Sequence, residues 1–388
     1  LKQKLVGEEE ELLLQVKKET GIDTQIWAAR SIAQVFDKLS LPYSRTLKSN
    51  APSFTKNFLK EHPHPLVQKI AKAREINKAH TTFIDTILKH EHKGRIHADI
   101  NPIKSDQGGT VTGRFSYSNP NLQQIPARNK DLGPMIRGLF IPEKDCKWGC
   151  FDYSQQEPRL VVHYAATTEP ICFNDSVTKI VEKFKHDSVD FHQTVADMAN
   201  ISRSQAKTIN LGLFYGMGKA KLQAELGLNT KQEAEDLFDQ YHDKVPFVRE
   251  LMNRTSSFAQ ISGSIGTLLG RKCRFDKWEP ATFGMHTPMT LEEAERTYGR
   301  GRIRRAFTYK ALNKLIQGSA ADMTKKAMLD LYREGIIPHI QIHDELDLSV
   351  ESPERAKKII EIMENAVTLK VPNKVDYESG ETWGDIYD

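Results

Sequence analysis

The chain has 388 residues, of which 39% are hydrophobic and 27% charged, which excludes a disordered or collagen-like protein and predicts two to three structural units. No apolar run reaches the roughly 18 residues of a membrane helix, so we expect no membrane partner. The net charge is +4, but residues 1–130 hold 21 Lys and Arg against 13 Asp and Glu, whereas the rest carries 34 against 38. The basic first third predicts a polyanion-binding arm beside an acidic metal centre, with a merely solvated helical surface as the alternative.

The first third of the chain predicts helices followed by an extended connection. Residues 8–19 and 66–90 predict amphipathic helices, because their apolar side chains recur at helical spacing. Residues 94–128 change character, since glycines, asparagines and prolines there mark an extended, turn-rich stretch. We therefore expect a helical N-terminal part joined to the remainder by irregular chain.

A strand, an acid and a helix succeed one another near the middle of the chain. The apolar run 148–151 predicts a short strand that Asp152 closes, and residues 158–166 have a helical pattern. A carboxylate at the end of an apolar strand is costly unless something compensates its charge. Asp152 is therefore a candidate metal ligand, with an ordinary strand-ending turn as the alternative.

Long helical patterns dominate residues 176–334. Residues 176–260 predict helices, and Ser202 is the expected N-cap of one that begins at Arg203. Residues 262–303, rich in Gly, Thr, Pro and Arg, predict loops, and residues 304–334 return to helix. Because the strands are few and lie far apart in the sequence, the predicted fold class is α+β rather than a regular βαβ array.

A hairpin is predicted near the C-terminus. Apolar and polar residues alternate on both sides of His343, Asp344 and Glu345, which predicts two antiparallel strands with the acids at their tip. If the strand before Asp152 lies beside this hairpin, the carboxylates converge. Two carboxylates plus substrate phosphates are the ligand set expected for Mg²⁺. Acids that only end strands in turns are again the alternative.

A stripe of side chains marks the helix that begins after Ser202. Arg203, Lys207, Leu211 and Tyr215 are spaced by four, so they lie along one side of a helix at intervals of about 6 Å. Two cations, an apolar side chain and an aromatic ring suit a nucleoside triphosphate laid along the helix, with its phosphates at the N-terminal end, which attracts anions. The alternative is an ordinary amphipathic helix with a solvated basic end.

Five segments follow one another in this order over about residues 110–350. They are Thr112-Gly113-Arg114 with residues 119–126, Asp152 to Arg159, Arg203 to Gly216, residues 313–322 and His343 to Leu346. These segments resemble motifs of the family A DNA polymerases, the DNA polymerase I type, in a form similar to phage members, and the second, third and fifth of them resemble motifs A, B and C. The resemblance implies an α+β right-hand fold with a small antiparallel palm sheet. It also implies a helical thumb (residues 1–125), a palm (residues 126–165 and 304–388) and helical fingers (residues 166–303).

The activity implied by the resemblance is that of a DNA-directed DNA polymerase, a nucleotidyltransferase that extends a primer 3′-hydroxyl by a two-metal-ion reaction. The implied cofactors are two Mg²⁺ ions, which Mn²⁺ can replace, and the implied partners are primer–template DNA and deoxynucleoside triphosphates. The implied protein is a monomer in the cytoplasm of a bacterial or phage-infected cell, with an organelle as the alternative. The first hundred residues hold no Asp-x-Glu pair, so we expect no proofreading exonuclease in this chain.

The resemblance also implies roles for single residues. For catalysis they are Asp152, Asp344, Glu345 and Lys207, with Asp152, Asp344 and the carbonyl of Tyr153 as metal ligands. For the nucleotide they are Arg203, Lys207, Leu211, Tyr215, Gln156, Glu157 and His192, with Glu157 excluding a ribose 2′-hydroxyl. For DNA they are Arg114, Asn313, Gln317, His343 and Arg159. Donor side chains in the minor groove meet acceptors that every base pair offers, so they test pair shape without reading sequence.

Two other functions stay open at this point. Single-subunit RNA polymerases and reverse transcriptases share the hand and the two-metal chemistry, but Glu157 and Tyr215 favour deoxynucleotides. A catalytically inactive DNA-binding module is the other alternative, but the two aspartates of the predicted metal site argue against it. The sequence also departs from the family pattern at two places. Leu211 stands where Phe or Tyr is usual, and residues 276–302 form a longer segment than the corresponding loop of the family.

Overall fold

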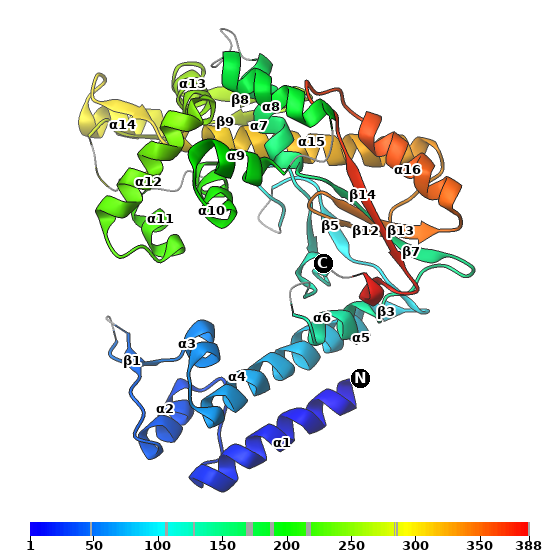
Figure 1. Ribbon diagram of the computed structural model, residues 1–388. Coiled ribbons are helices and arrows are strands. Elements are labelled where there is room, and N and C mark those ends of the chain that lie inside the picture. Colours follow the sequence, from blue (N-terminus) through cyan, green and yellow to red (C-terminus); the bar gives the residue numbers. More distant parts are fainter. Residues whose placement is uncertain are drawn as a thin grey trace. The chain divides into compact units, whose positions relative to one another are not determined.

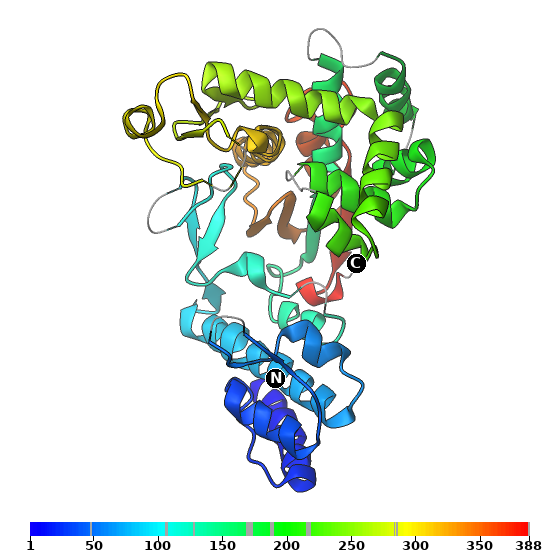
Figure 2. The same ribbon diagram turned by 90° about the vertical axis from the view of Figure 1, so that its left-hand side faces the viewer.

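The computed structural model describes residues 1–46, 49–104, 108–126, 129–167, 174–186, 190–214, 219–282, 284 and 286–386 (Figures 1 and 2). The chain divides into two compact units: unit 1 holds residues 1–100, 117–143 and 379–388, and unit 2 holds residues 101–116 and 144–378. The expected division into thumb, palm and fingers is finer than this one and stays a prediction.

Unit 1 is mainly helical and has a core of its own. Phe36 is fully buried in this core, with the rings of Phe54 and Phe58 4.8 and 5.8 Å from its own. Its elements are α1 (Lys2–Thr20), α2 (Ala29–Lys38), β1 (Ser44–Arg45), β2 (Pro52–Ser53), α3 (Lys56–Glu61), α4 (Pro65–Lys78), a π-helix (Ala79–Ile84), α5 (Asp85–His90), β3 (Glu91–His92), β4 (Arg95–Ile96), a 3₁₀ turn (Leu122–Gln124), α6 (Leu132–Arg137) and a 3₁₀ turn (Trp383–Asp385).

The two helices predicted in unit 1 are confirmed. Residues 8–19 lie within α1, and residues 66–90 are helical throughout, although a π-helical turn separates α4 from α5. Local chemistry explains why helix α4 begins at Pro65. The ring of His64 accepts the N–H of Leu66, and the N–H that proline lacks would have no partner within the helix at this first position. The buried side chains of α4 recur at helical spacing and face α1.

Unit 2 combines a small sheet with helices. Its elements are β7 (Lys147–Tyr153), α7 (Gln156–Thr167), α8 (Asn174–His186), α9 (Phe191–Ala199), α10 (Arg203–Phe214), α11 (Lys219–Leu226), α12 (Lys231–Lys244), α13 (Pro246–Ser262), β8 (Ser264–Gly266), β9 (Lys272–Arg274), β10 (Trp278–Pro280), α14 (Leu291–Tyr298), β11 (Ile303–Arg305), a 3₁₀ turn (Thr308–Lys310), α15 (Ala311–Arg333), β12 (Ile340–Ile342), β13 (Glu345–Val350) and α16 (Pro353–Asn365). Three further strands include residues of both units: β5 (Asp99–Asn101), β6 (Ser116–Ser118) and β14 (Val375–Gly380). The predicted α+β class is confirmed.

The central sheet of unit 2 has the strand order β12-β13-β7-β14, and β7 runs antiparallel to β13 (Figure 1). Alternate residues of β7 and β13 point to opposite faces. One face carries Phe151, Leu346 and Leu348, which join the large hydrophobic core of the unit. The opposite face carries Asp152 and Glu345, which are direct partners across the two strands. The pairing therefore keeps these two acids out of the core.

Four expectations about element bounds need correction. Asp152 lies inside β7 rather than after its last residue, and α7 begins at Gln156, earlier than predicted. Residues 262–303 are not only loops, because they contain the hairpin β8–β9 and helix α14. Helix α15 begins only at Ala311, since residues 303–305 form β11. Within the described ranges, every helix is too short or too polar to cross a membrane.

Candidate active site

The tip of the predicted hairpin lies beside the end of β7. His343 and Asp344 form the two-residue turn between β12 and β13, with His343 at a φ of 57°. Glu345 is the register partner of Asp152, and the N–H of Tyr153 donates to the carbonyl of Asp344 at 3.3 Å. Backbone pairing thus brings the acids of motifs A and C to one end of the sheet, as the sequence predicted.

Two further predicted residues approach this end of the sheet. The guanidinium Nη2 of Arg114 lies 2.8 Å from Oε1 of Glu157 in an ion pair. Desolvation raises the pKa of the Asp344 carboxyl, and the positive charge of Arg114 opposes this shift. Desolvation lowers the pKa of His343, an effect that Arg114 strengthens and Glu157 opposes. These electrostatic couplings link the four side chains within one site.

The donor set at this site suits a hard divalent cation. Asp152 is exposed, and both it and Asp344 offer carboxylate oxygens, the ligand type that Mg²⁺ prefers. Among the described residues, one group of three potential metal ligands lies within 4.8 Å, namely Cys150, Glu345 and Asp347. The thiol of Cys150 donates to Oδ1 of Asp347 at 2.5 Å, and a thiol ligand suits softer metals. The pair of carboxylates from Asp152 and Asp344 therefore fits Mg²⁺ better than the group that contains Cys150.

The basic start of α10 forms a second group of candidate residues. Ser202 is the helix N-cap, as predicted, because its hydroxyl accepts the N–H of Gln205 at 3.2 Å. Arg203 is exposed and pairs through Nε with Asp190 at 2.5 Å. Lys207, one turn further along, is exposed as well. The side chain of Leu211 and the whole of Tyr215 and Gly216 lie outside the described residues.

His192 lies beside this basic stripe. It belongs to the first turn of α9, and its Nδ1 is 3.1 Å from Nδ2 of Asn210 on α10. Desolvation lowers the pKa of the imidazole, Asp190 opposes the shift, and the charges of Lys207 and Arg203 add to it. A neutral ring flanked by two cations leaves this end of α10 positively charged, as a phosphate site requires.

Two predicted contact residues are instead buried in the fold. Gln156 donates from Nε2 to Thr324 of α15 at 3.3 Å. Arg159 is 3% exposed and donates to the carbonyls of Ser154 and Pro372 at 2.8 and 2.5 Å. Both positions lie on the first turns of α7, which contact the core. Their burial does not favour contact with a nucleotide or with DNA.

Arg271 joins two of the predicted segments, although nothing in its sequence surroundings indicates this. Its guanidinium Nη2 donates to the carbonyls of Thr112 and Gly318 at 2.6 and 3.0 Å, and its Nε donates to Asp322 at 3.2 Å. Gly318 and Asp322 belong to α15, which also carries Asn313 and Gln317, both half-buried. Arg271 therefore ties the segment that carries Arg114 to the helix that carries the other predicted duplex contacts.

The space that Arg271 occupies depends on two glycines. A Cβ on Gly113, which has a φ of +83°, would lie 2.6 Å from the guanidinium carbon of Arg271. A Cβ on Gly318 would lie 2.9 Å from its Nη2 and 2.6 Å from the methyl group of Thr267. Side chains at either position would displace the guanidinium. The glycine of the Thr-Gly-Arg segment thus has a packing role in addition to its turn conformation.

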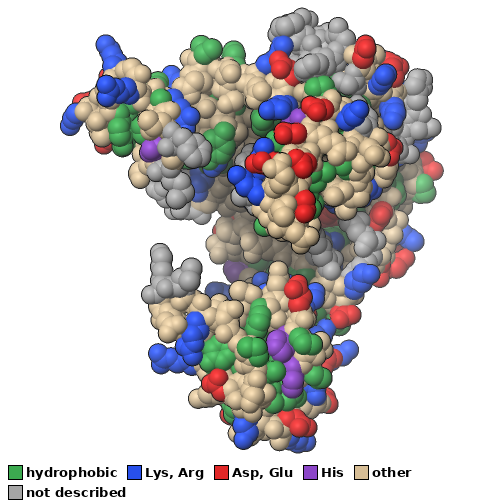
Figure 3. Space-filling view, turned by 60° about the vertical axis from the view of Figure 1, so that its left-hand side comes forward, with side chains coloured by type: hydrophobic (Ala, Val, Ile, Leu, Met, Phe, Trp, Pro, Cys, Tyr) green, Lys and Arg blue, Asp and Glu red, His purple; other side chains and the backbone are tan. Residues whose placement is uncertain are grey.

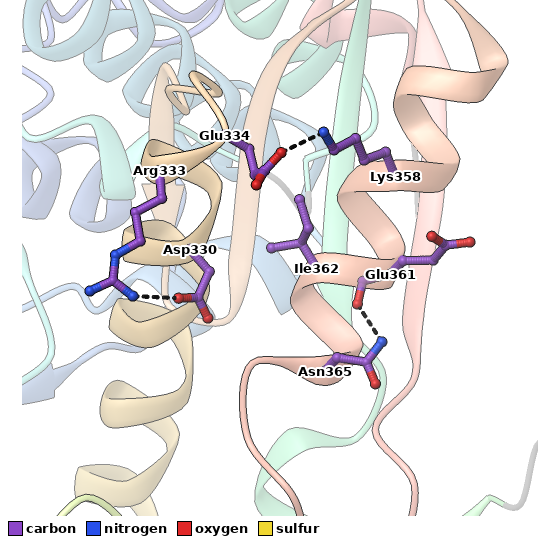
Figure 4. A pocket seen from close by; sticks show the side chains of 7 residues that line it. All are labelled: Asp330, Arg333, Glu334, Lys358, Glu361, Ile362 and Asn365. Carbon is purple, nitrogen blue, oxygen red and sulfur yellow. Dashed lines mark hydrogen bonds and ion pairs between the residues drawn. The ribbon is translucent and has the colours of Figure 1, made fainter.

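A groove of about 480 Å³ lies elsewhere in unit 2, between α15 and α16 (Figure 4). Lys358 reaches across it to Glu334 at 2.5 Å, and Arg333 pairs with Asp330 at 3.5 Å. The described residues that line it include none of the predicted site residues. Most of its charged side chains form ion pairs with each other, which is typical of a solvated surface.

The basic residues of unit 1 do not form one continuous patch on the face that Figure 3 shows. Lys and Arg side chains lie at separate places there, between apolar, acidic and histidine side chains. Within unit 1, Lys72 forms an ion pair with Asp131 at 2.8 Å. The predicted polyanion-binding arm therefore stays a prediction.

Comparison with known proteins gives a consistent result. The model of the family described as DNA polymerase family A matches residues 1–385. The DNA-directed DNA polymerase of Pseudomonas phage M6 is 33% identical over 423 residues, which cover 97% of this chain and 60% of the relative. DNA polymerase I of Geobacillus stearothermophilus is 34% identical over 366 residues, covering 90% of this chain and 38% of the relative.

A solved structure has the same fold. The POL domain of Pol1 from M. smegmatis, in complex with DNA primer-template and dNTP, matches with a TM-score of 0.76 and 25% sequence identity. The match covers 99% of this chain and 65% of the other. The chain thus spans less than two thirds of the length of these relatives.

Proposed function

Because the chain belongs to DNA polymerase family A, we propose that it extends the 3′-hydroxyl of a primer with deoxynucleoside triphosphates under the direction of a DNA template. The observation that carries this proposal is the pairing of Glu345 with Asp152, which lies beside Asp344 and the Arg114–Glu157 ion pair. We also propose that the protein is a monomer that acts in the cytoplasm.

Asp152 and Asp344 would hold two Mg²⁺ ions, with the carbonyl of Tyr153 as a further ligand and Glu345 as an auxiliary acid. When bound, the ions would make the primer hydroxyl more acidic and neutralise charge on the triphosphate. The fixed strand register supports this assignment, because backbone pairing holds the two chain segments together without relying on side-chain contacts.

Arg203, Lys207 and His192 would bind the triphosphate at the start of α10. The exposure of the two cations and the positive charge that they share support this role. Lys207 would donate a proton to the leaving pyrophosphate oxygen, a form of general acid catalysis. Asp190 would orient Arg203 through the ion pair that it already forms.

Glu157 would exclude a ribose 2′-hydroxyl, whereas Arg114, Asn313, Gln317 and His343 would contact the duplex near the primer end. Amide and guanidinium donors suit the minor groove, where every base pair presents acceptors. The basic residues of unit 1 would bind phosphates, a contact independent of sequence and weakened by salt.

Primer extension on a labelled hairpin tests the proposed function. Extension that requires Mg²⁺, uses a DNA template and prefers deoxynucleotides is the expected result. Asp152→Asn should abolish it, whereas Asp145→Asn is the matched control, because Asp145 is exposed and its positive φ suits Asn. A preference for ribonucleotides or an RNA template would support the related polymerases instead, and DNA binding without extension would support an inactive binding module.

A further inference from the structure

The ion pair between Arg114 and Glu157 joins two residues to which the proposed function gives separate tasks. Their side chains are 18% and 13% exposed, and Nη2 of Arg114 lies 2.8 Å from Oε1 of Glu157. The Nε of Arg114 is buried and has no hydrogen-bond partner among the described residues. One guanidinium therefore holds the carboxylate of Glu157 and keeps a second donor available.

Both residues of this ion pair belong to segments of unit 2 that hydrogen bonds hold in place. Glu157 belongs to the first turn of α7. The carbonyl of Arg114 accepts the hydroxyl of Thr110 at 2.8 Å, and the carbonyl of Thr112 accepts Arg271 at 2.6 Å. The position of the Glu157 carboxylate is thus linked to the same network that holds Arg114.

We propose that Arg114 is a positioning residue for sugar selection, because it holds Glu157 in the conformation that excludes a 2′-hydroxyl. This inference rests on the proposed function. A glutamate side chain adopts many rotamers, so a carboxylate that must block one oxygen atom needs a partner that selects a single rotamer. A guanidinium with several fixed donors does this better than the single ammonium group of lysine.

The test measures the efficiency of deoxynucleotide incorporation divided by that of ribonucleotide incorporation. Both are measured at saturating primer–template, so that a loss of DNA affinity cancels in this ratio. Arg114→Ala should lower this ratio at least about tenfold, and Arg114→Lys should lower it less. Gln317→Ala is the matched control, since Gln317 has the same proposed duplex role but lies on α15 and has no charge with which to hold Glu157. Its ratio should equal that of the unaltered protein.

A double variant separates positioning from a direct effect. In a Glu157→Ala background, Arg114→Ala should cause no further loss of selectivity, because the residue that it positions is already absent. If the two losses multiply, or if Arg114→Ala keeps the original ratio, the inference is wrong. A protein that extends no primer at all would overturn the proposed function, and the inference with it.

A second measurement does not depend on catalysis. On a primer that ends in a dideoxynucleotide, the concentration of deoxy- or ribonucleoside triphosphate needed to stabilise the complex reports binding alone. Arg114→Ala should bring the two concentrations closer together. An unchanged gap between them would contradict the inference even if this variant is inactive in extension.

Discussion

The end of the central sheet and the start of α10 hold their functional side chains by different means. At the sheet, strand register pairs Asp152 with Glu345, and a backbone hydrogen bond joins Tyr153 to Asp344. On α10, Arg203 and Lys207 are exposed, and Arg203 forms a side-chain ion pair with Asp190. The sheet fixes its acids through the backbone, whereas the helix presents long cations that can adjust.

This difference matches the two tasks proposed for the regions. Metal ligands must keep a fixed geometry, so small displacements are costly. Phosphate groups can be reached by flexible cations from several directions, because their charge is spread over several oxygens. We therefore expect substitutions at the sheet to have larger effects than substitutions on the helix.

The largest effect is expected at the sheet. Asp152→Ala or Asp344→Ala should reduce extension at least about a thousandfold, since loss of a metal ligand removes roughly 4 kcal/mol of transition-state stabilisation. Single-turnover extension measures the rate, and a binding assay should show that primer–template affinity is retained. More than a tenth of the original activity in either variant would refute the metal assignment.

A smaller effect is expected on the helix. Lys207→Ala should lower the rate of the chemical step about a hundredfold, the lower end of the usual range for loss of a general acid. Lys221→Ala on α11 is the control, because Lys221 is exposed and its ion pair with Glu225 is long, at 3.9 Å. Equal rates for both variants would mean that Lys207 does not take part in the chemical step.

Substitution of Arg271 tests the connection between the segment that carries Arg114 and helix α15. Arg271→Ala should weaken primer–template binding about tenfold with a smaller change in the maximal rate, because it releases the segment before Arg114. Arg271→Lys should restore part of the affinity, and Arg274→Ala, an exposed neighbour on β9, should change neither value. Since Asp322 is only 7% exposed, thermal unfolding must be measured as well, and a loss explained wholly by unfolding would contradict the positioning role.

The smallest effect concerns Leu211. With no hydroxyl at this position, dideoxynucleotides should be used poorly. Leu211→Tyr would add a donor worth about 1 kcal/mol or more, and dideoxynucleotide use should rise several-fold relative to deoxynucleotides. Competitive chain termination measures this ratio. Unchanged termination in an active variant would mean that residue 211 does not face the sugar.

Local signals in the sequence predict the parts of the structure that local contacts create. Ser202 caps α10 through a residue three positions away, and alternation predicts the hairpin around Asp344. Helix α14 has the same kind of signal, since Thr290 and Glu293 form a capping box. The Gly and Pro content of residues 262–303 hides this signal and favours the wrong prediction of loops there.

Contacts between distant residues cannot be predicted in this way. Arg271 bonds to Thr112 and Asp322, which lie far from it in the sequence, and no spacing rule connects them. Similarly, the resemblance assigns Arg159 a contact with DNA, but Arg159 lies on the side of α7 that is buried by packing. Such positions depend on tertiary contacts that a single sequence does not reveal.

The pairing of β13 with β7 also restricts how the chain can vary in length. Leu346 lies opposite Phe151 on the core side, one position from the pair formed by Glu345 and Asp152. A slip of β13 by one residue along β7 would bring Glu345 opposite Phe151 and turn its carboxylate toward the core. The two strands can therefore exchange many of their side chains, but an insertion or deletion of a single residue within β7 or β13 would shift this register or force a bulge.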